Sequence, residues 1–253
     1  YQRMDTLSDG YGEFSNPAVT ARRFSAARAR ESFARAGFDK AGADGILVNS
    51  EGRRLSFTVT TGYPRLKDVL MILQQEARKA GLELQLEILD STTAWKKIQE
   101  KNHEICLTAL NRSVELYPRY FDFWHSYNAY REDGSLKPDT NNFTVTAIPE
   151  WDALIERYER STDLAEIKEI AWQLEEKIYQ DAAFVPGWVR PFFQCAYWRW
   201  IRWPDGFSAR LAREHDELNV HWIDPVIEAE TRAAMKAGED LGAQTLNFDQ
   251  FKS

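Results

Sequence analysis

The sequence predicts an α/β fold with a parallel β-sheet, and residues 55–110 carry most of this prediction. Apolar and polar residues alternate at 55–60 and again at 82–88, which is the period of a half-buried strand. Between them, residues 64–80 place apolar side chains at helical spacing and end at Gly81. A strand–helix–strand unit with connections this short implies a right-handed parallel crossover.

The residues before this unit predict one helix and one hairpin. Residues 1–24 are polar and show no sustained period, so we expect an irregular lead-in. Ser25 can cap a helix over residues 26–36, which Gly37 would end. Asp-Gly and Glu-Gly pairs flank the apolar residues 46–48, which favours a short hairpin there.

The residues after the second strand continue the α/β pattern. Thr92 can cap a short helix that carries Trp95 and Ile98, and residues 105–110 form a third strand. The polar residues 131–149 then predict a long loop.

Two amphipathic helices follow this loop. We expect the first over residues 150–160 and the second over 164–179. Asp163 and Glu166 have the spacing of a capping pair at the start of the second helix. The chain then turns extended from residue 184, and a weakly amphipathic helix begins after residue 223.

Composition excludes several classes of protein. The chain has 253 residues and a net charge of −7, which argues against a nucleic-acid surface because phosphate binding needs a basic face. No run approaches the roughly 18 consecutive apolar residues of a membrane helix. Cys106 and Cys195 lie in apolar, strand-like runs, where buried free thiols are favoured over a disulfide.

The motifs of common enzymes and metal sites are missing from the sequence. There is no H-E-x-x-H, P-loop, G-x-S-x-G or G-x-G-x-x-G after a strand. We therefore expect no catalytic residues, no metal centre and no cofactor. The rival interpretation is a carboxylate-dependent hydrolase that uses a pair such as Asp122 and Glu115.

Aromatic residues are the positive signal for a binding site. Nine tryptophans are present, and aromatic side chains gather outside the helices at 117–130, 188–193 and 197–203. Arginines interleave with them, a combination that suits stacking on a neutral or zwitterionic organic ligand. The alternative is a tryptophan-rich packing seam between two lobes.

Several segments, taken in order, match a known family. They are the run Glu76–Gly81 before the strand at 82–89, Trp95, the aromatic segment around Pro118, Asn141-Asn142-Phe143 ahead of residues 148–155, and residues 182–186. With them, residues 55–204 resemble the C-terminal half of the family 5 extracellular solute-binding proteins. These are the dipeptide-, oligopeptide- and nickel-binding receptors of bacterial ABC importers. The resemblance is greatest to the branch that takes up oligopeptides and peptide antibiotics of the microcin C type.

The resemblance implies a periplasmic-binding-protein type II fold, with two lobes around a cleft. Residues 56–185 would form the second α/β lobe. Residues 1–55 would be a lead-in and hairpin belonging mainly to the first lobe or connector, and residues 186–253 would return to the first lobe and form the tail. An N-terminal half of the same protein would complete the cleft, and hinges would lie near 54–56 and 186–188.

The resemblance also implies a function without chemistry. The protein would capture a peptide or peptide-like solute between its lobes and deliver it to an inner-membrane ABC permease. It would be periplasmic, or extracellular and lipid-anchored. The alternative is a receptor of the same fold for a non-peptide solute such as an oligosaccharide, an opine or a nickel chelate.

Family members hold the ligand with loops at the ends of the second-lobe strands. The family's aspartate for the peptide amine is replaced here by Val114, so the resemblance implies that Glu115 takes this role or that the ligand lacks an amine there. Arg112 could pair with a carboxylate, or be merely solvated. The expected ligand-binding residues are Tyr63, Asn111, Arg112, Glu115, Tyr117, Asn141 and Trp188.

Overall fold

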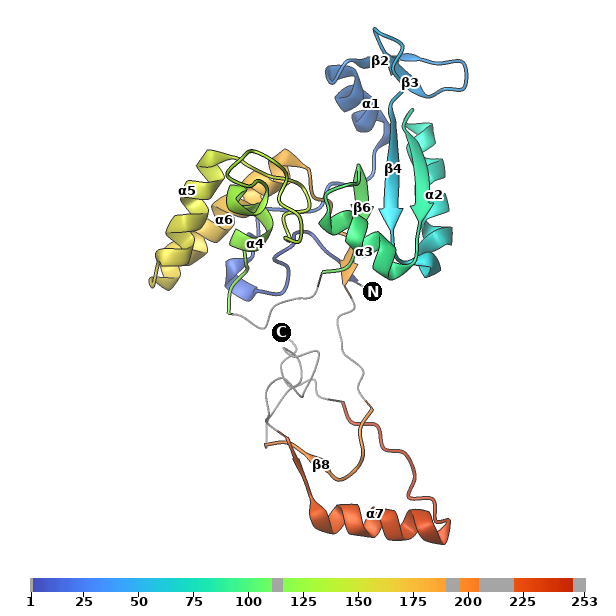
Figure 1. Cartoon of the computed structure of the whole chain (residues 1–253), viewed down its shortest axis with the longest axis vertical. Helices are drawn as coiled ribbons and strands as arrows, with labels where there is room; N and C mark the ends of the chain where they lie inside the picture. Colours follow the sequence, from blue (N-terminus) through green and yellow to red (C-terminus); the bar gives the residue numbers. More distant parts are fainter. Residues whose placement is uncertain (1, 111–115, 190–195, 205–220, 248–253) are drawn as a thin grey trace. The chain divides into compact units, whose positions relative to one another are not determined.

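The structure is a computed structural model that describes residues 2–110, 116–189, 196–204 and 221–247 (Figure 1). The described residues fall into two compact units. The larger unit contains residues 5–110 and 116–186, and the smaller contains residues 2–4 and those from Gly187 onward. The division of the chain into a first and a second lobe stays a prediction.

A three-stranded parallel sheet forms the α/β part of the larger unit. Its strands are β4 (Ser56–Thr61), β5 (Glu83–Ile88) and β6 (Ile105–Leu107), in the order β5-β4-β6. The first two strands confirm the sequence prediction. The third ends three residues earlier than predicted.

Two helices cover opposite faces of this sheet. Leu84 packs with Val59 and with Leu70 of α2 (Lys67–Lys79), while Lys97 of α3 (Ser91–Gln99) donates to both carboxylate oxygens of Glu87 at 2.8 and 2.6 Å. Side chains of successive strand residues point to opposite faces, so Leu84 and Glu87 face opposite sides. The hydrogen bonds to Lys97 and Thr60 lower the pKa of Glu87.

The burial of the α2 side chains differs from the prediction that one apolar face of this helix packs against the core. A 3-10 turn, η2 (Pro64–Leu66), precedes the helix. Leu70 is 2% exposed, but Val69 and Leu73, which the helical spacing assigned to the same face, are 49% and 50% exposed. Residues 69–73 are five consecutive apolar residues that span more than one turn and point to all sides of it, so periodicity did not identify which of them meets the sheet.

The predicted helix caps are confirmed in one case and corrected in another. Ser25 accepts from the Arg28 amide at the start of α1 (Ala26–Arg35), as predicted. Asp90 caps α3 by accepting from the Thr92 and Thr93 amides, so the prediction of Thr92 as the cap was wrong. These hydrogen bonds to Thr93 and Thr92 lower the pKa of Asp90.

The predicted hairpin is an antiparallel pair, β2 (Phe38–Ala41) and β3 (Leu47–Asn49). The residues of β2 are half-buried or exposed, which explains why no apolar alternation revealed this strand. Leu47 of β3 is buried and donates its amide to the Gly81 carbonyl at 2.8 Å, so the hairpin is held against the end of α2.

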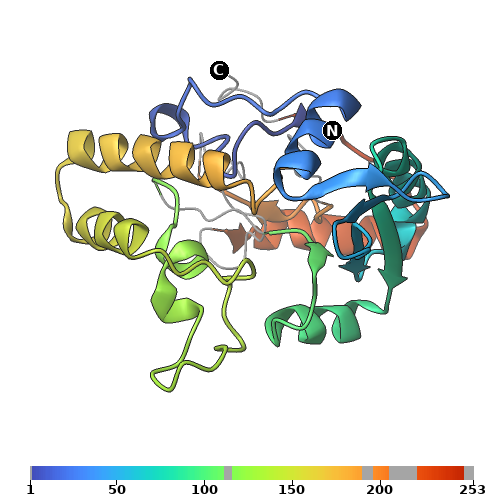
Figure 2. The same cartoon turned by 90° about the horizontal axis from the view of Figure 1, so that it is seen from above.

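A helical layer forms the rest of the larger unit, and Figure 2 shows α5 (Pro149–Arg160) and α6 (Leu164–Asp181) side by side. Its other elements are η1 (Gly12–Phe14), α4 (Phe121–Trp124) and η3 (Ser126–Asn128). Asp163 caps α6 as predicted. Glu166 does not complete a capping pair, because its carboxylate accepts instead from Arg157 and Ser161, both at 2.6 Å.

A buried carboxylate joins the N-terminal segment to this layer. Glu175 of α6 is 4% exposed and accepts from the Thr6 hydroxyl at 3.0 Å and from the Asn16 amide. Burial raises the pKa of Glu175. Tyr120 lies beside it, 1% exposed, and burial raises the pKa of its phenol well above the usual value.

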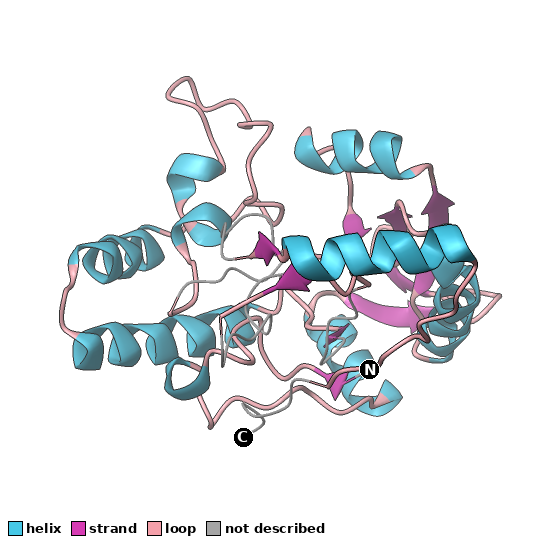
Figure 3. Ribbon diagram, turned by 90° about the horizontal axis from the view of Figure 1, so that it is seen from below, coloured by secondary structure: helices cyan, strands magenta, loops and turns pink. Residues whose placement is uncertain are grey.

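The described residues of the smaller unit form two short antiparallel pairs and one helix. Strand β1 (Gln2–Arg3) pairs with β7 (Trp188–Val189), and β8 (Ile201–Arg202) pairs with β9 (Trp222–Ile223). The predicted tail helix is α7 (Pro225–Ala237), capped by Asp224 (Figure 3). None of the helices in the described ranges combines the length and apolarity that crossing a bilayer requires.

Candidate functional site

The carboxyl edge of the parallel sheet is the first part of the candidate site, because ligands of open α/β sheets bind outside the carboxyl ends of the strands. At this edge Thr61 donates its hydroxyl to the Leu107 carbonyl at 2.9 Å and accepts from the Tyr63 amide at 3.2 Å. A Cβ on Gly62 would lie 2.8 Å from the Ser91 Cα atom. Glycine is therefore required for α3 to begin this close to the end of β4.

Tyr63 stands at this edge as the sequence predicted. It is half-buried and leads into η2, and the guanidinium of Arg65 lies 5.8 Å from its ring centroid. That distance is within the range of a cation–π interaction. A partly exposed aromatic ring beside an arginine is suited to contact an organic solute.

The far end of α3 holds a second region, the loop around residues 139–146. Lys101, only 7% exposed, donates its ammonium to the Thr140 carbonyl at 2.6 Å and to the Thr140 hydroxyl at 3.1 Å. The Asp139 amide donates to the Gln99 carbonyl at 3.1 Å. Burial lowers the pKa of Lys101 to about 8. The loop is therefore fastened to the C-terminal end of α3.

Asn142 organises this loop from inside. It is fully buried, and its amide group donates to the His125 and Thr146 carbonyls at 3.1 and 2.8 Å while its oxygen accepts from the Thr146 amide at 2.8 Å. All three partners are main-chain groups. The Thr146 amide and carbonyl have no other hydrogen-bond partner among the described residues, whereas the His125 carbonyl also accepts from the Asn128 amide at 3.0 Å. Asn142 is thus a structural residue, and its side chain is not available to a ligand.

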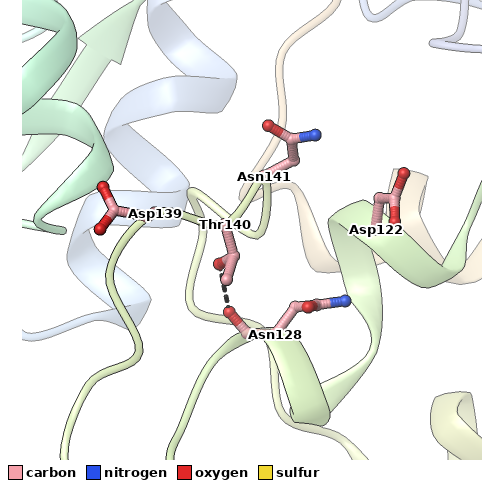
Figure 4. A pocket seen from close by; sticks show the side chains of 5 residues that line it. All are labelled: Asp122, Asn128, Asp139, Thr140 and Asn141. Atoms are coloured by element: carbon pink, nitrogen blue, oxygen red, sulfur yellow. Dashed lines mark hydrogen bonds between the residues drawn. The ribbon is translucent and has the colours of Figure 1, made fainter.

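Asn141, the neighbouring residue, lines a polar pocket of about 200 Å³. Figure 4 shows the five lining side chains, with the Thr140 hydroxyl bonded to the Asn128 carbonyl. Asp122 and Asp139 contribute carboxylates, so the pocket suits an amine, a guanidinium or another polar group with hydrogen-bond donors. The sequence did not single out Asn128 of η3, or Asp139 and Thr140 of the long loop, because no periodicity marks isolated polar residues in such segments.

The structure does not bring the described site residues into one cluster. Tyr63 lies at the N-terminal end of α3 and Asn141 near its C-terminal end, and a nine-residue helix is about 13 Å long. Tyr117 packs with Phe14 and edge-on with Tyr158, each at 5.7 Å between ring centroids. In the described part of the chain, no hydrogen bond or ring contact joins Tyr63, Tyr117 and Asn141.

The remaining predicted residues stay predictions. Trp188 belongs to β7 of the smaller unit and is 42% exposed. Asn111, Arg112 and Glu115 lie outside the described residues. The residues of the rival hydrolase pair do not meet in the described ranges, since Glu115 is outside them and Asp122 forms an exposed ion pair with Arg119 at 3.2 Å. Within the same ranges, no group of three or more metal-ligating side chains is present.

Comparison with known proteins identifies the class of this fold. The oligopeptide-binding protein AppA of Bacillus subtilis, solved in complex with a nonapeptide, matches 88% of this chain and 42% of its own, with a TM-score of 0.66 and 16% identity. The oligopeptide-binding protein of Thermus thermophilus, solved with a pentapeptide, matches 74% and 33%, with a TM-score of 0.63 and 19% identity. The chain therefore has the periplasmic-binding-protein type II fold, as predicted.

The family follows from the sequence match. Residues 4–178, well over half of the chain, match the bacterial extracellular solute-binding proteins, family 5 Middle. The chain belongs to this family, which consists of binding proteins of ABC transporters and not of enzymes. A probable ABC transporter-binding protein of Deinococcus radiodurans is 29% identical over 104 residues, which are 38% of this chain and 18% of that protein. The chain thus spans less than half the length of these relatives.

Proposed function

We propose that this chain is part of the substrate-binding component of an ABC importer that captures a peptide or peptide-like solute and releases it unchanged to a membrane permease. The observation that carries the proposal is the family match over residues 4–178, together with two structural neighbours that hold a nonapeptide and a pentapeptide. Capture without chemistry agrees with a family of binding proteins. The protein would work outside the cytoplasmic membrane, in the periplasm or on a lipid anchor.

The ligand would lie against the carboxyl edge of the sheet. Tyr63 stands at this edge, and the chain continues from β6 into the segment that contains Arg112 and Glu115. We expect Glu115 to receive a peptide amine and Arg112 a peptide carboxylate, because a guanidinium can bind a carboxylate in bidentate fashion. Trp188 would stack on the ligand from the segment after residue 186.

The smaller unit would belong to a first lobe that further residues of the same protein complete. Two observations support this. The relatives are more than twice as long as the part that this chain matches. The smaller unit also exposes large apolar side chains at fractions of 50–66%: Trp198, Trp222, Ile223 and Val226. An apolar set of this kind is normally covered by another surface.

The test is to identify and then perturb the ligand. Native mass spectrometry of the protein from its own cells should show a ladder of bound peptides. Glu115→Gln and Trp188→Ala should each weaken peptide binding at least tenfold by calorimetry, while the melting temperature changes little. Phe24→Ala, which removes a 72% exposed aromatic ring outside the three aromatic groups, should change neither quantity.

Other outcomes separate the alternatives. If a single sugar, opine or metal chelate is found bound, the protein is a receptor of the same fold for a non-peptide solute. If Trp188→Ala lowers the melting temperature but leaves affinity unchanged, the residue packs in the core and the proposed site is wrong. If the protein hydrolyses the bound solute, and Asp122→Asn or Glu115→Gln abolishes that turnover, the hydrolase interpretation is supported instead.

A further inference from the structure

A hydroxyl group lies between two carboxyl groups where the N-terminal segment, residues 5–22, packs on α6. The Thr6 hydroxyl oxygen is 3.0 Å from Oε1 of Glu175 and 3.1 Å from Oδ1 of Asp9. The same oxygen accepts from the Ser8 amide at 3.1 Å. Thr6 is 7% exposed and Glu175 is 4% exposed, so solvent has little access to this contact.

The hydrogen atoms at this contact are too few if both carboxyl groups are ionised. A threonine hydroxyl carries one hydrogen, and an ionised carboxylate carries none. The Thr6 hydroxyl can therefore form a full hydrogen bond to Asp9 or to Glu175, but not to both. Two acceptor oxygens would then face each other at hydrogen-bond distance. A proton on one carboxyl group removes this conflict, because that group donates to Thr6 while Thr6 donates to the other.

The environments of the two carboxyl groups place this proton on Glu175. Asp9 is half-buried, and its carboxylate also accepts from the Asp5 amide at 2.6 Å and from the Thr6 amide at 3.2 Å. These donors stabilise the ionised form of Asp9. Glu175 lies deeper, and burial outweighs its hydrogen bonds and raises its pKa.

The described titratable groups around Glu175 are also acids. Asp9 comes from the N-terminal segment and Tyr120 from the residues before α4, and the Tyr120 phenol in turn faces Tyr11 and Tyr158 of α5. Burial raises the pKa of Tyr120 well above its usual value, so the phenol stays neutral. Among the described residues, no lysine, arginine or histidine nitrogen lies within 4.0 Å of the Glu175 carboxylate. An ionised Glu175 would therefore have no cation beside it to compensate its charge.

We propose that Glu175 is a proton-binding switch, which ties the N-terminal segment to α6 when it carries a proton and loosens that segment when it loses it. In the protonated state Glu175 donates to Thr6, Thr6 donates to Asp9, and the second Glu175 oxygen accepts from the Asn16 amide. When the proton passes to solvent, one of these hydrogen bonds is lost and an uncompensated charge remains in the interior.

The sign of the pH dependence follows from linkage. The pKa of Glu175 is raised above the ordinary 4.5, so its contribution is complete below pH 4.5 and is lost as pH rises through the raised value. Over that interval, the equilibrium constant for opening the segment should rise by up to about tenfold per pH unit. The exposed ion pair between Glu13 and Lys168, which joins the same segment to α6 at 3.1 Å, would act in the opposite direction, because acid discharges Glu13.

The experiment is hydrogen exchange of the 253-residue chain, measured by mass spectrometry over residues 5–16 at about pH 5, 6, 7 and 8. Glu175→Gln is the reference at each pH, because its amide can donate to Thr6 and its carbonyl can accept from Asn16 as the protonated acid does. The ratio of the two exchange rates cancels the intrinsic effect of pH. Exchange of the unchanged protein, relative to Glu175→Gln, should become at least about threefold faster between pH 5 and pH 8.

A matched variant and a second measurement complete the test. Glu176→Gln changes the same residue type one position along α6, where the side chain is exposed and accepts from Gln180 at 2.7 Å, so its exchange should keep the pH dependence of the unchanged protein. Carbon-13 NMR of the glutamate carboxyl groups in the unchanged protein, assigned through their bonds to the backbone, should show Glu175 titrating above pH 4.5. This titration does not depend on the folding of any variant.

Three results would overturn the proposal. The first is a Glu175 carboxyl that titrates at or below pH 4.5. The second is an exchange ratio between the unchanged protein and Glu175→Gln that stays constant from about pH 5 to 8, because the proton would then not govern the attachment of the segment. The third is a pH dependence that Glu176→Gln abolishes, since the switch would then lie on the surface of α6.

Discussion

Asn142→Ala should destabilise the larger unit strongly, although it removes only a small polar side chain. The side chain is fully buried and makes three hydrogen bonds of 2.8–3.1 Å, two to carbonyls and one from an amide. Alanine removes all three hydrogen bonds and leaves the Thr146 amide and carbonyl without a partner among the described residues, while the His125 carbonyl keeps the Asn128 amide. At about 1 kcal/mol for each hydrogen bond, the free energy of unfolding should fall by about 3 kcal/mol.

The assay is urea denaturation at about 25 °C, followed by far-UV circular dichroism, for the unchanged protein and two variants. Asn141→Ala is the matched control, because Asn141 is the same residue type one position earlier and its side chain faces the polar pocket (Figure 4). It should change the free energy of unfolding by less than about 0.5 kcal/mol. If the two variants are equally stable, the hydrogen bonds of Asn142 do not hold the loop and the reasoning is refuted.

Two further predictions concern α3. Burial lowers the pKa of Lys101 to about 8, against 10.5 for the exposed group. Between these two pH values the unfolded chain therefore binds more protons than the folded chain. The contribution of Lys101 to the free energy of unfolding should then rise with pH, by up to about 1.4 kcal/mol per pH unit. Urea denaturation between about pH 7.5 and 9.5 should show this rise as the difference between the unchanged protein and Lys101→Met; parallel curves would mean that the lysine is not effectively buried. Gly62→Ala should cost about 1–3 kcal/mol, because its Cβ would lie 2.8 Å from the Ser91 Cα atom, and the melting temperature should fall accordingly. Gly187→Ala is the control, since nothing lies within 4 Å of its Cβ position, and an equal loss in both variants would contradict the close-approach argument.

Local sequence signals predicted most of the elements because they act within a few residues. Alternation over 55–60 and 82–88 corresponds to β4 and β5, and Ser25 caps α1 as its side-chain chemistry requires. The cap of α3 shows the limit of such signals. Asp90, Ser91 and Thr92 are all suitable caps, and only the position of β5 and Gly62 decides that the helix begins after Asp90.

Contacts between distant segments could not be predicted in this way. Asn141 and Asn142 are adjacent and identical, yet one lines a pocket and the other is fully buried. The difference depends on His125 and on the carbonyls that the folded loop turns toward Asn142, which no spacing in the sequence reveals. The same holds for Lys101, whose partner Thr140 is 39 residues away.

The sequence by itself determined the class of fold and the family, because an ordered set of strands, helices and short motifs survives as a one-dimensional pattern. Only the tertiary structure decided which of the apolar residues 69–73 of α2 meets the sheet, since five consecutive apolar residues span more than one helical turn and periodicity cannot distinguish among them. It also decided that Tyr63 and Asn141 stand at opposite ends of α3. Burial is a property of what packs against a residue, and that depends on segments far away along the chain.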